Sequence, residues 1–213
     1  MKYVVGIDEV GRGPLAGPVT VCVVACQENF YKKLKRSKLL PKRGLDSKKL
    51  SPMSRQTYTE ALKSLVSSRV LDTRSLMSKG IFDMRFSYAV VHVSNKVIDK
   101  KGISFAIKKA IGQGIEKLKL KPKKCKLLLD GGLSAPTEFT NQKTIIKGDE
   151  KEKIIAWASI LAKTSRDSLM GRMGKIFPKY GFEKHKGYAT RAHREAISEN
   201  GCSTFHRLTW IIK

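Results

Sequence analysis

Hydrophobic positions along this chain fall into two alternating patterns. Short runs of mostly β-branched residues at 3–7 and 19–25, separated by a glycine-rich connection, predict a β-hairpin. Similar runs predict further strands at 86–93, 126–129 and 144–147. Apolar residues three or four positions apart predict helices at 53–67, 103–118, 150–170 and 191–200. Because strands alternate with helices, the fold class is predicted to be α/β with a mixed sheet.

Two segments follow neither pattern. Residues 69–85 mix polar and apolar types and are interpreted as an inserted segment. Residues 31–43 contain seven Lys or Arg, which fits a solvated loop or frayed helix as well as it fits a contact to a phosphate backbone.

Carboxylates stand where three of the predicted strands end. These residues are Asp8 and Glu9, Asp130, and Asp149. If the first and fourth strands are neighbours in one sheet, Asp8 and Asp130 lie at a shared rim. Neighbouring residues on a regular strand point to opposite faces, so Glu9 joins Asp8 only if the strand ends or twists there, or through its backbone carbonyl. Asp149, taken alone, is interpreted as a helix N-cap.

Acids at such a rim need partners, because an isolated ionised carboxylate is costly to remove from water. A set of carboxylates without histidine suits Mg²⁺ or Mn²⁺ better than zinc. Two such cations about 4 Å apart could activate a water, hold a scissile phosphate and stabilise the leaving oxygen. The adjacent loop Gly11-Arg12-Gly13 lets the backbone approach a ligand and offers a guanidinium to phosphate, although a lone Gly-x-Gly is more often a tight turn.

The charge balance points to an anionic partner. The 213 residues include 43 Lys and Arg against 18 Asp and Glu, a formal net charge of +25. Such an excess makes nucleic acid the first partner to consider, although a generally basic proteome would give the same composition.

Cysteine usage indicates a reducing compartment. Four cysteines occur without a C-x-x-C pair or a zinc-binding spacing, and Cys22 and Cys26 are expected to pack as small hydrophobic residues. The chain opens without a charged-then-apolar leader and contains no run of 18 apolar residues. We therefore expect a cytoplasmic protein that neither spans a membrane nor is secreted by that route.

Six motifs occur in an order that resembles bacterial ribonuclease HII. They lie at 6–18, 46–50, 129–131, 147–149, 158–163 with 166–167, and 185–188. The resemblance spans essentially the whole chain, and the Gly-Arg-Gly loop separates it from ribonuclease HIII. It implies an RNase H-like fold in which helices flank a central mixed sheet. It also implies one catalytic domain, 1–213, with a C-terminal helical and loop region from about 176 that contributes substrate contacts.

The resemblance further implies a divalent-metal endoribonuclease, using Mn²⁺ or Mg²⁺, that cuts the RNA strand of RNA–DNA hybrids and leaves 5′-phosphate and 3′-hydroxyl ends. Cleavage on the 5′ side of ribonucleotides embedded in duplex DNA belongs to the same expectation. By motif, the metal-binding and catalytic carboxylates would be Asp8, Glu9, Asp130 and Asp149.

Substrate contacts are carried over in the same way. Gly11, Arg12 and Gly13 would read the ribose, Ser47, Lys48 and Lys49 would contact phosphate, and Tyr188 would pack on the deoxyribose after the RNA-to-DNA junction. Only a contact to the 2′-hydroxyl distinguishes RNA from DNA, and the shallow minor groove is within reach of backbone groups. Departures from the family pattern include Val10 and the stretch Glu150-Lys151-Glu152, which adds negative charge near Asp149.

Several interpretations stay open. His185 could assist a proton transfer or serve the structure, and Asp167, which stands beside Arg166, is expected to make a local ion pair. The hypothesis is a monomeric, cytoplasmic two-metal nuclease. The alternatives are a non-catalytic RNA-binding protein with the same basic surface, or an RNase H-like nuclease of another specificity.

Overall fold

A five-stranded mixed sheet forms the centre of the computed structural model, which describes residues 2–36, 50–67 and 85–211. The strand order is β3-β2-β1-β4-β5. Strands β1, β2 and β3 pair antiparallel, whereas β1 with β4 and β4 with β5 pair parallel. The bounds are β1 Tyr3–Val10, β2 Val19–Gln27, β3 Phe86–Val93, β4 Cys125–Asp130 and β5 Gln142–Ile145.

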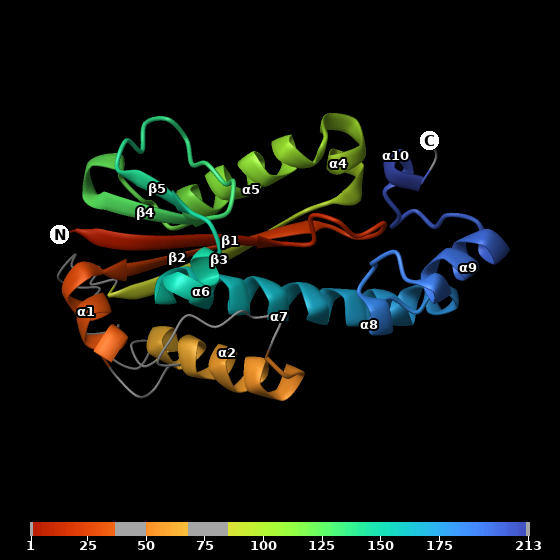
Figure 1. Cartoon of the computed structure of the whole chain (residues 1–213), viewed down its shortest axis with the longest axis horizontal. Coiled ribbons are helices and arrows are strands. Elements are labelled where there is room, and N and C mark those ends of the chain that lie inside the picture. The colour runs from red at the N-terminus through yellow and green to blue at the C-terminus, as the bar shows by residue number, and fades with distance from the viewer. Residues whose placement is uncertain (1, 37–49, 68–84, 212–213) are drawn as a thin grey trace, which may run out of the picture.

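Helices cover both faces of this sheet (Figure 1). On one face lie α4 (Asn95–Lys101) and α5 (Ile103–Lys117), and on the other lies the 24-residue α7 (Lys153–Ile176), with α2 (Pro52–Ser67) packed beneath it. At the strand ends stand α1 (Glu28–Arg36), the short turn η2 (Pro122–Lys124) and α6 (Gly148–Lys151). The C-terminal elements are η3 (Pro178–Tyr180), α8 (Phe182–His185), α9 (Arg191–Asn200) and α10 (Leu208–Ile211).

Alternation along the strands divides the core into two layers. Val5 of β1 and Leu127 of β4 point to the α5 side, whereas Val4 and Leu128 point to the α7 side. At Gly6 the backbone of α7 comes so close that a Cβ atom would collide with the carbonyl of Ile154. Glycine at this position lets α7 lie directly against β1, close to the end of the strand that carries Asp8 and Glu9.

A third hydrophobic cluster joins the C-terminal elements to the rest of the chain. Its buried residues are Ala16, Met170, Tyr180, Phe182 and Ala196. Ala16 belongs to the connection between β1 and β2, so the C-terminal segment packs against the N-terminal hairpin through the far part of α7. None of the helices in the described part of the chain is long and apolar enough to cross a membrane.

The predicted mixed α/β fold is confirmed. The expected elements differ mainly at their ends, and the short helices α4, α8 and α10 were not predicted. β1 runs through Asp8 and Glu9 to Val10, because its pairing with β2 continues to the Val10–Thr20 pair. The expected helix 150–170 is two helices, separated at Glu152, whose backbone is extended, and the second helix reaches Ile176. The predicted insertion lies, except for Arg85, outside the described residues.

Candidate metal centre and its flanking loops

Two neighbouring parallel strands bring together three of the four acids. The register places Ile7 opposite Leu129, so the next residue of each strand, Asp8 and Asp130, stands at the same edge of the sheet. Ligand oxygens of Asp8, Glu9 and Asp130 lie within 4.8 Å of one another. Adjacent strand positions therefore contribute to one cluster of carboxylates, and the carboxylate of Glu9 is part of that cluster.

Asp8 is the most buried member of this group, with 5% of its surface exposed. Burial raises the pKa of its carboxyl well above the usual value, and repulsion from Glu9 and Asp130 raises it further. A hydrogen bond from the Ser159 side chain and one from the Glu9 N–H, at 2.7 Å, act in the opposite direction. The net effect disfavours the charged form of Asp8. A bound cation would offset the repulsion among these carboxylate oxygens.

Each of the other two acids has a partner beside the cluster. The Nε of Arg12 lies 3.2 Å from the Oε1 of Glu9, while 54% of the Arg12 side chain stays exposed. The N–H of Gly148, at the start of α6, donates to Oδ1 of Asp130 at 2.6 Å. The donor set thus consists of oxygens held in place by backbone and guanidinium groups, which suits a hard divalent cation.

Asp149 is not brought within the 4.8 Å group of carboxylates. Its Oδ1 accepts a hydrogen bond of 3.0 Å from the N–H of Glu150, in the first turn of α6. It nevertheless follows directly on Gly148, whose N–H holds Asp130. The fourth predicted ligand therefore stands next to the cluster with its side chain turned to its own helix.

The loop after β1 is held from beneath by Arg207, a residue the sequence interpretation did not single out. Its guanidinium donates to the carbonyls of Gly11 at 2.6 Å, Arg12 at 2.9 Å and Gly17 at 2.9 Å. Arg207 is fully buried, and burial lowers its pKa. Because carbonyls are its only acceptors in this set, the side chain fixes the shape of the loop and leaves Arg12 and Gly13 facing outward.

A second buried arginine joins this loop to the one before Tyr188. Arg166 of α7 donates to the carbonyls of Ala16 at 3.2 Å, Pro18 at 3.0 Å and Lys186 at 2.9 Å. The expected local ion pair of Asp167 is present within α7, but its partner is not the neighbouring Arg166. The carboxylate of Asp167 instead contacts Lys163 at 2.7 Å and Arg55 at 3.7 Å.

A sequence signal for Arg166 existed. It lies four residues after Ala162 and four before Met170, both of them buried, so its side chain falls on the apolar side of the helix. Arg207 follows a loop and carries no comparable periodicity.

Tyr188 lies in a loop that is hydrogen-bonded to the loop after β1. The Leu15 N–H donates to the Gly187 carbonyl at 2.8 Å, and the Tyr188 N–H donates to the His185 carbonyl at 3.0 Å. The side chain of Tyr188 is 41% exposed. The structure thus places this predicted junction contact and the Gly11–Gly13 loop in one connected surface, although 177 residues separate Gly11 from Tyr188.

A chain of histidines holds the backbone of Tyr188. The Ser203 N–H donates to Nδ1 of His206 at 2.9 Å, so the proton of His206 is on Nε2. That atom lies 3.1 Å from Nε2 of His193, which must accept, leaving Nδ1 of His193 to donate to the Tyr188 carbonyl at 2.8 Å. Burial lowers the pKa of His193 to about 4, which keeps this arrangement neutral.

His185 has a comparable structural set of bonds. Its Nδ1 accepts from the Gly187 N–H at 3.2 Å, so its Nε2 donates to the Tyr180 carbonyl at 2.6 Å. These bonds favour the structural interpretation of His185 over a role in proton transfer. Ser47, Lys48 and Lys49 lie outside the described residues.

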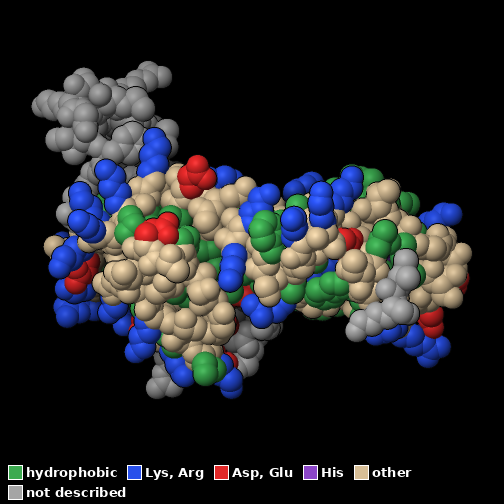
Figure 2. Space-filling view, turned by 90° about the horizontal axis from the view of Figure 1, so that it is seen from above, with side chains coloured by type: hydrophobic (Ala, Val, Ile, Leu, Met, Phe, Trp, Pro, Cys, Tyr) green, Lys and Arg blue, Asp and Glu red, His purple; other side chains and the backbone are tan. Residues whose placement is uncertain are grey.

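The described surface carries many basic side chains. Figure 2 shows Lys and Arg side chains scattered over the visible face, with few Asp and Glu side chains between them. This distribution fits a net charge of +25 and a polyanionic partner.

Sequence comparison places the chain among known proteins. A family model described as ribonuclease HII matches residues 5–213. Ribonuclease HII of Bacillus cytotoxicus is 38% identical over 211 residues, covering 99% of this chain and 69% of that protein. Ribonuclease HII of Aliarcobacter butzleri is 38% identical over 214 residues, covering 100% of this chain and 93% of that protein.

Comparison with solved structures finds similar folds among ribonucleases H. Ribonuclease H2 from Pyrococcus horikoshii OT3 superposes with a TM-score of 0.66 at 25% identity, covering 98% of this chain and 93% of the other. Ribonuclease HII from Archaeoglobus fulgidus, solved in complex with PCNA, gives 0.64 at 25% identity, covering 99% and 95%. Bst-RNase HIII in complex with Mn²⁺ gives 0.56 at 15% identity, covering 94% of this chain and 63% of the other, and shares the fold.

Proposed function

The chain belongs to the ribonuclease HII family, and on this premise we propose that it cuts RNA–DNA hybrids and nicks duplex DNA on the 5′ side of an embedded ribonucleotide. Family membership makes it a ribonuclease H with an RNase H-like fold, a metal-dependent endoribonuclease. The finer proposal covers the cleavage position, the number of cations and the residues that hold them.

One observation carries the proposal for the metal site. Oxygens of Asp8, Glu9 and Asp130 converge within 4.8 Å at the rim of two parallel strands, on a protein of net charge +25. We propose that these three acids hold two Mg²⁺ or Mn²⁺ ions. Such a pair of ions, when bound, lowers the pKa of the attacking water and neutralises charge on the scissile phosphate. The products would be 5′-phosphate and 3′-hydroxyl ends.

Asp149 is proposed as the fourth ligand. Its neighbour Gly148 already donates to Asp130, so Asp149 needs only to turn its side chain from the Glu150 N–H toward the cluster. Glu152, one of the family departures, does not crowd this position. Its carboxylate lies 3.5 Å from the Tyr31 hydroxyl and 3.8 Å from the Lys35 amine, so it is directed to residues of α1.

The two connected loops are proposed to read the substrate sugar. Gly13 has open space where a Cβ would stand, and Gly11 takes a positive φ of 86° that favours glycine. Backbone groups of Gly11, Arg12 and Gly13 would contact the 2′-hydroxyl, the one group that distinguishes RNA from DNA. Tyr188 would pack on the following deoxyribose, where a hydroxyl would be less well accommodated.

We infer further that the chain acts as a single catalytic domain in which residues from about 176 onward contribute substrate contacts. Tyr188 lies in this region, and its neighbour Gly187 accepts a hydrogen bond from Leu15 in the loop after β1, which supports that inference. Ser47, Lys48 and Lys49 are proposed as phosphate contacts on the family resemblance alone. A monomer acting in the cytoplasm remains part of the proposal, consistent with four free cysteines.

The decisive experiment is cleavage of a DNA duplex with one embedded ribonucleotide, with Mg²⁺, Mn²⁺ or EDTA. Wild type is compared with Asp130→Asn and with Glu116→Gln, a matched change on the exposed side of α5. We expect a metal-dependent nick on the 5′ side of the ribonucleotide that is lost in Asp130→Asn and kept in Glu116→Gln.

Other outcomes separate the alternatives. Cutting of long hybrids without a nick at a single ribonucleotide would remove the junction-reading role of Tyr188 and the Gly11–Gly13 loop. Binding without cleavage of either substrate would favour the RNA-binding protein. Cleavage of an all-DNA duplex would favour a nuclease of another specificity.

A further inference from the structure

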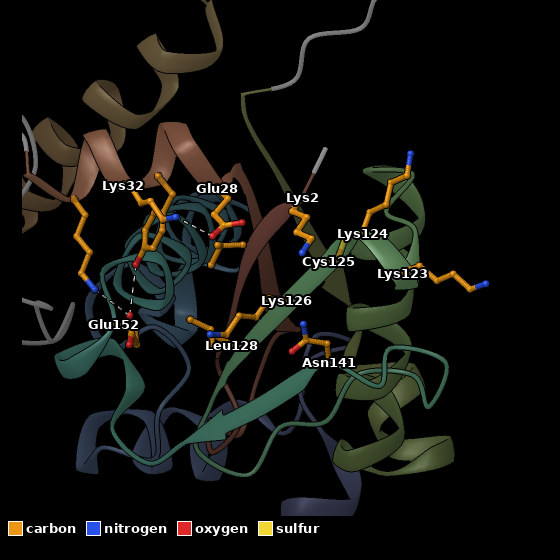
Figure 3. A pocket seen from close by; sticks show the side chains of 13 residues that line it. Lys2, Glu28, Lys32, Lys123, Lys124, Cys125, Lys126, Leu128, Asn141 and Glu152 are labelled. Atoms are coloured by element: carbon orange, nitrogen blue, oxygen red, sulfur yellow. Dashed lines mark hydrogen bonds and ion pairs between the residues drawn. The ribbon is translucent and has the colours of Figure 1, made fainter.

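A second site, basic instead of acidic, lies at the opposite ends of the strands that carry the acids. A cavity of about 540 Å³ opens between α1, η2 and the beginnings of β1 and β4 (Figure 3). Six of the residues that line it are lysines, namely Lys2, Lys32, Lys35, Lys123, Lys124 and Lys126. The metal centre is built from carboxylates, whereas this cavity is built mainly from amines.

Carboxylates at the cavity neutralise only part of this charge. Glu28 pairs with Lys32 at 3.0 Å and Glu152 lies 3.8 Å from Lys35, and these are the two acids in the lining. Within the described residues, no ion pair involves Lys2, Lys123, Lys124 or Lys126. Four positive charges are therefore left to attract an anion.

The field of these amines acts inside the cavity. The pKa of Glu28 is lowered chiefly by its hydrogen bond and charge contact with Lys32, and Lys2 and Lys126 lower it further. Lys2 just before β1, Lys32 in α1 and Lys126 in β4 thus all act on the carboxylate of Glu28. A ligand with several negative charges would experience all of them at once.

The cavity opens on the same face of the sheet as the metal centre. Alternation puts Lys2 and Val4 on the face of Asp8, and Lys126 and Leu128 on the face of Asp130. Six residues separate Lys2 from Asp8, which corresponds to about 20 Å along a strand. The α6 segment reaches both sites, since Gly148 at its start donates to Asp130 and Glu152 directly after it lines the cavity.

We propose that this cavity binds backbone phosphates of the nucleic acid about six nucleotides away from the cut, since successive phosphates of one strand in a duplex are about 3.4 Å apart along the axis. The inference rests on the proposed function. Among the described residues, the lining contains lysines and no arginine, so these residues offer mobile point charges instead of a planar fork. Such a site adds affinity without reading base sequence.

The test measures how binding depends on salt. A triple variant, Lys123→Gln with Lys124→Gln and Lys126→Gln, is compared with Lys101→Gln combined with Lys108→Gln and Lys109→Gln. The control lysines are exposed on α4 and α5, on the other face of the sheet, and the change in net charge is the same. Both sets carry Asp130→Asn, so that binding is measured without turnover.

Two sets of duplexes are used. In each set the ribonucleotide lies either about 4 or about 12 base pairs from one end of the duplex, and the two sets differ in which end this is. Only the longer segment, or arm, between the ribonucleotide and that end reaches the cavity. We expect the pocket variant to reduce the slope of log K against log salt by about 2 to 3 on a long arm, at about 0.9 per phosphate lost. The short arms and the control variant should show no such change. Equal changes in both triple variants, or none in the pocket variant, would overturn the proposal.

A second pair of variants protects the test against loss of folding. Lys2→Gln with Lys32→Gln alters β1 and α1 instead of η2 and β4, and a slope reduction of about 1 to 2 is expected on the same long arm. No reduction in this pair would count against the cavity as a whole. Thermal unfolding of every variant shows whether a lost slope reflects a lost fold.

Inorganic tripolyphosphate distinguishes a nucleic acid from a soluble anion. It should compete with the long duplex for wild type and compete less for the pocket variant. If tripolyphosphate binds the cavity while the duplex slopes stay unchanged, the ligand is a soluble phosphate compound and the proposal fails. Cleavage by the wild-type protein is measured in parallel, and absence of cleavage would reject the proposed function. The salt dependence of binding tests the cavity separately, because it is measured without turnover.

Discussion

The acids and the sugar-reading loops are positioned by different means. Asp8 and Asp130 sit on paired strands, where the backbone ladder of the sheet sets their separation. Within the residues that the structure describes, the loops at 11–18 and 185–188 have a single bridge, between Ala16 and His206, and a few backbone bonds in place of a ladder, and buried side chains bond to their remaining carbonyls. A chemical centre that must hold oxygens close together is built on the most rigid element, whereas the recognition surface depends on a few individual side chains.

The two means differ in how they fail. A strand position is supported by many backbone bonds, so a side chain there can change without moving its neighbours. Each of the loops depends on one or two guanidinium or imidazole groups. Removal of such a group leaves several buried carbonyls without a hydrogen-bond donor. Substitution of an acid should therefore abolish cleavage without unfolding the protein. Substitution of a buried residue that holds a loop should reduce stability and substrate recognition together.

The largest effect is expected at Asp8. Loss of a residue that orients a metal ligand commonly costs 10- to 100-fold, so loss of a ligand itself should lower single-turnover cleavage by more than about 100-fold in Asp8→Asn. Because burial and neighbouring acids disfavour the charge of Asp8, the same variant should melt at a higher temperature than wild type without metal. Asp149→Asn should lose less activity, and an equal loss would place Asp149 in the centre on a par with Asp8.

A large loss of stability is expected at Arg207. Arg207→Met leaves the carbonyls of Gly11, Arg12 and Gly17 without their donor, at about 1 kcal/mol or more for each buried carbonyl. Urea unfolding should therefore show a loss of about 3 kcal/mol. Arg207→Lys keeps the charge but cannot reach three acceptors at once, so it should recover only part of the loss. A stable Arg207→Met would show that the loop is held by other contacts.

A pH-dependent effect of similar size is expected at His193. Its native pKa of about 4 is below the ordinary 6.5, so the unfolded chain binds more protons between these values and stability falls as pH falls from 6.5 toward 4. One pKa unit corresponds to about 1.4 kcal/mol, so a pKa lowered from 6.5 to about 4 should cost of the order of 3 kcal/mol over this pH range.

The measurement is urea unfolding across this pH range for wild type and His193→Gln. His185 and His206 face His193, and the pKa of His206 is also lowered by burial, so part of the dependence should remain in the variant. Equal slopes for the two proteins would contradict the assignment of a neutral imidazole to His193.

The smallest effect is expected at the surface of the recognition loop. Tyr188→Ala removes a packing contact of about 1 kcal/mol, so nicking at a single ribonucleotide should slow about fivefold. Tyr188→Phe keeps the ring and should stay within about twofold of wild type. Cleavage within a long hybrid, measured in parallel, should change little in either variant. A large loss on both substrates would mean that Tyr188 serves the fold instead of the junction.

The same contrast explains what could be predicted from the sequence. Asp8 and Asp130 follow β-branched or leucine-rich runs, and parallel pairing of those runs was enough to predict their meeting. Arg166 and Arg207 act on carbonyls 148 and 196 residues away, and no local pattern marks a backbone carbonyl as an acceptor. The histidine chain depends likewise on a fold in which residues 193 and 206 come together.

Helix α7 has a consequence for where the enzyme cuts. Ser159, which bonds to Asp8, and Arg166, which holds both loops, are seven residues apart, so they face the same side of the helix about 10 Å from each other. Under the proposed roles, two turns of one helix act as a ruler between the cleaved phosphate and the sugar that is read. One residue inserted between them would turn the far part by about 100°. The register of cleavage would then be lost even though every ligand and every contact residue remained.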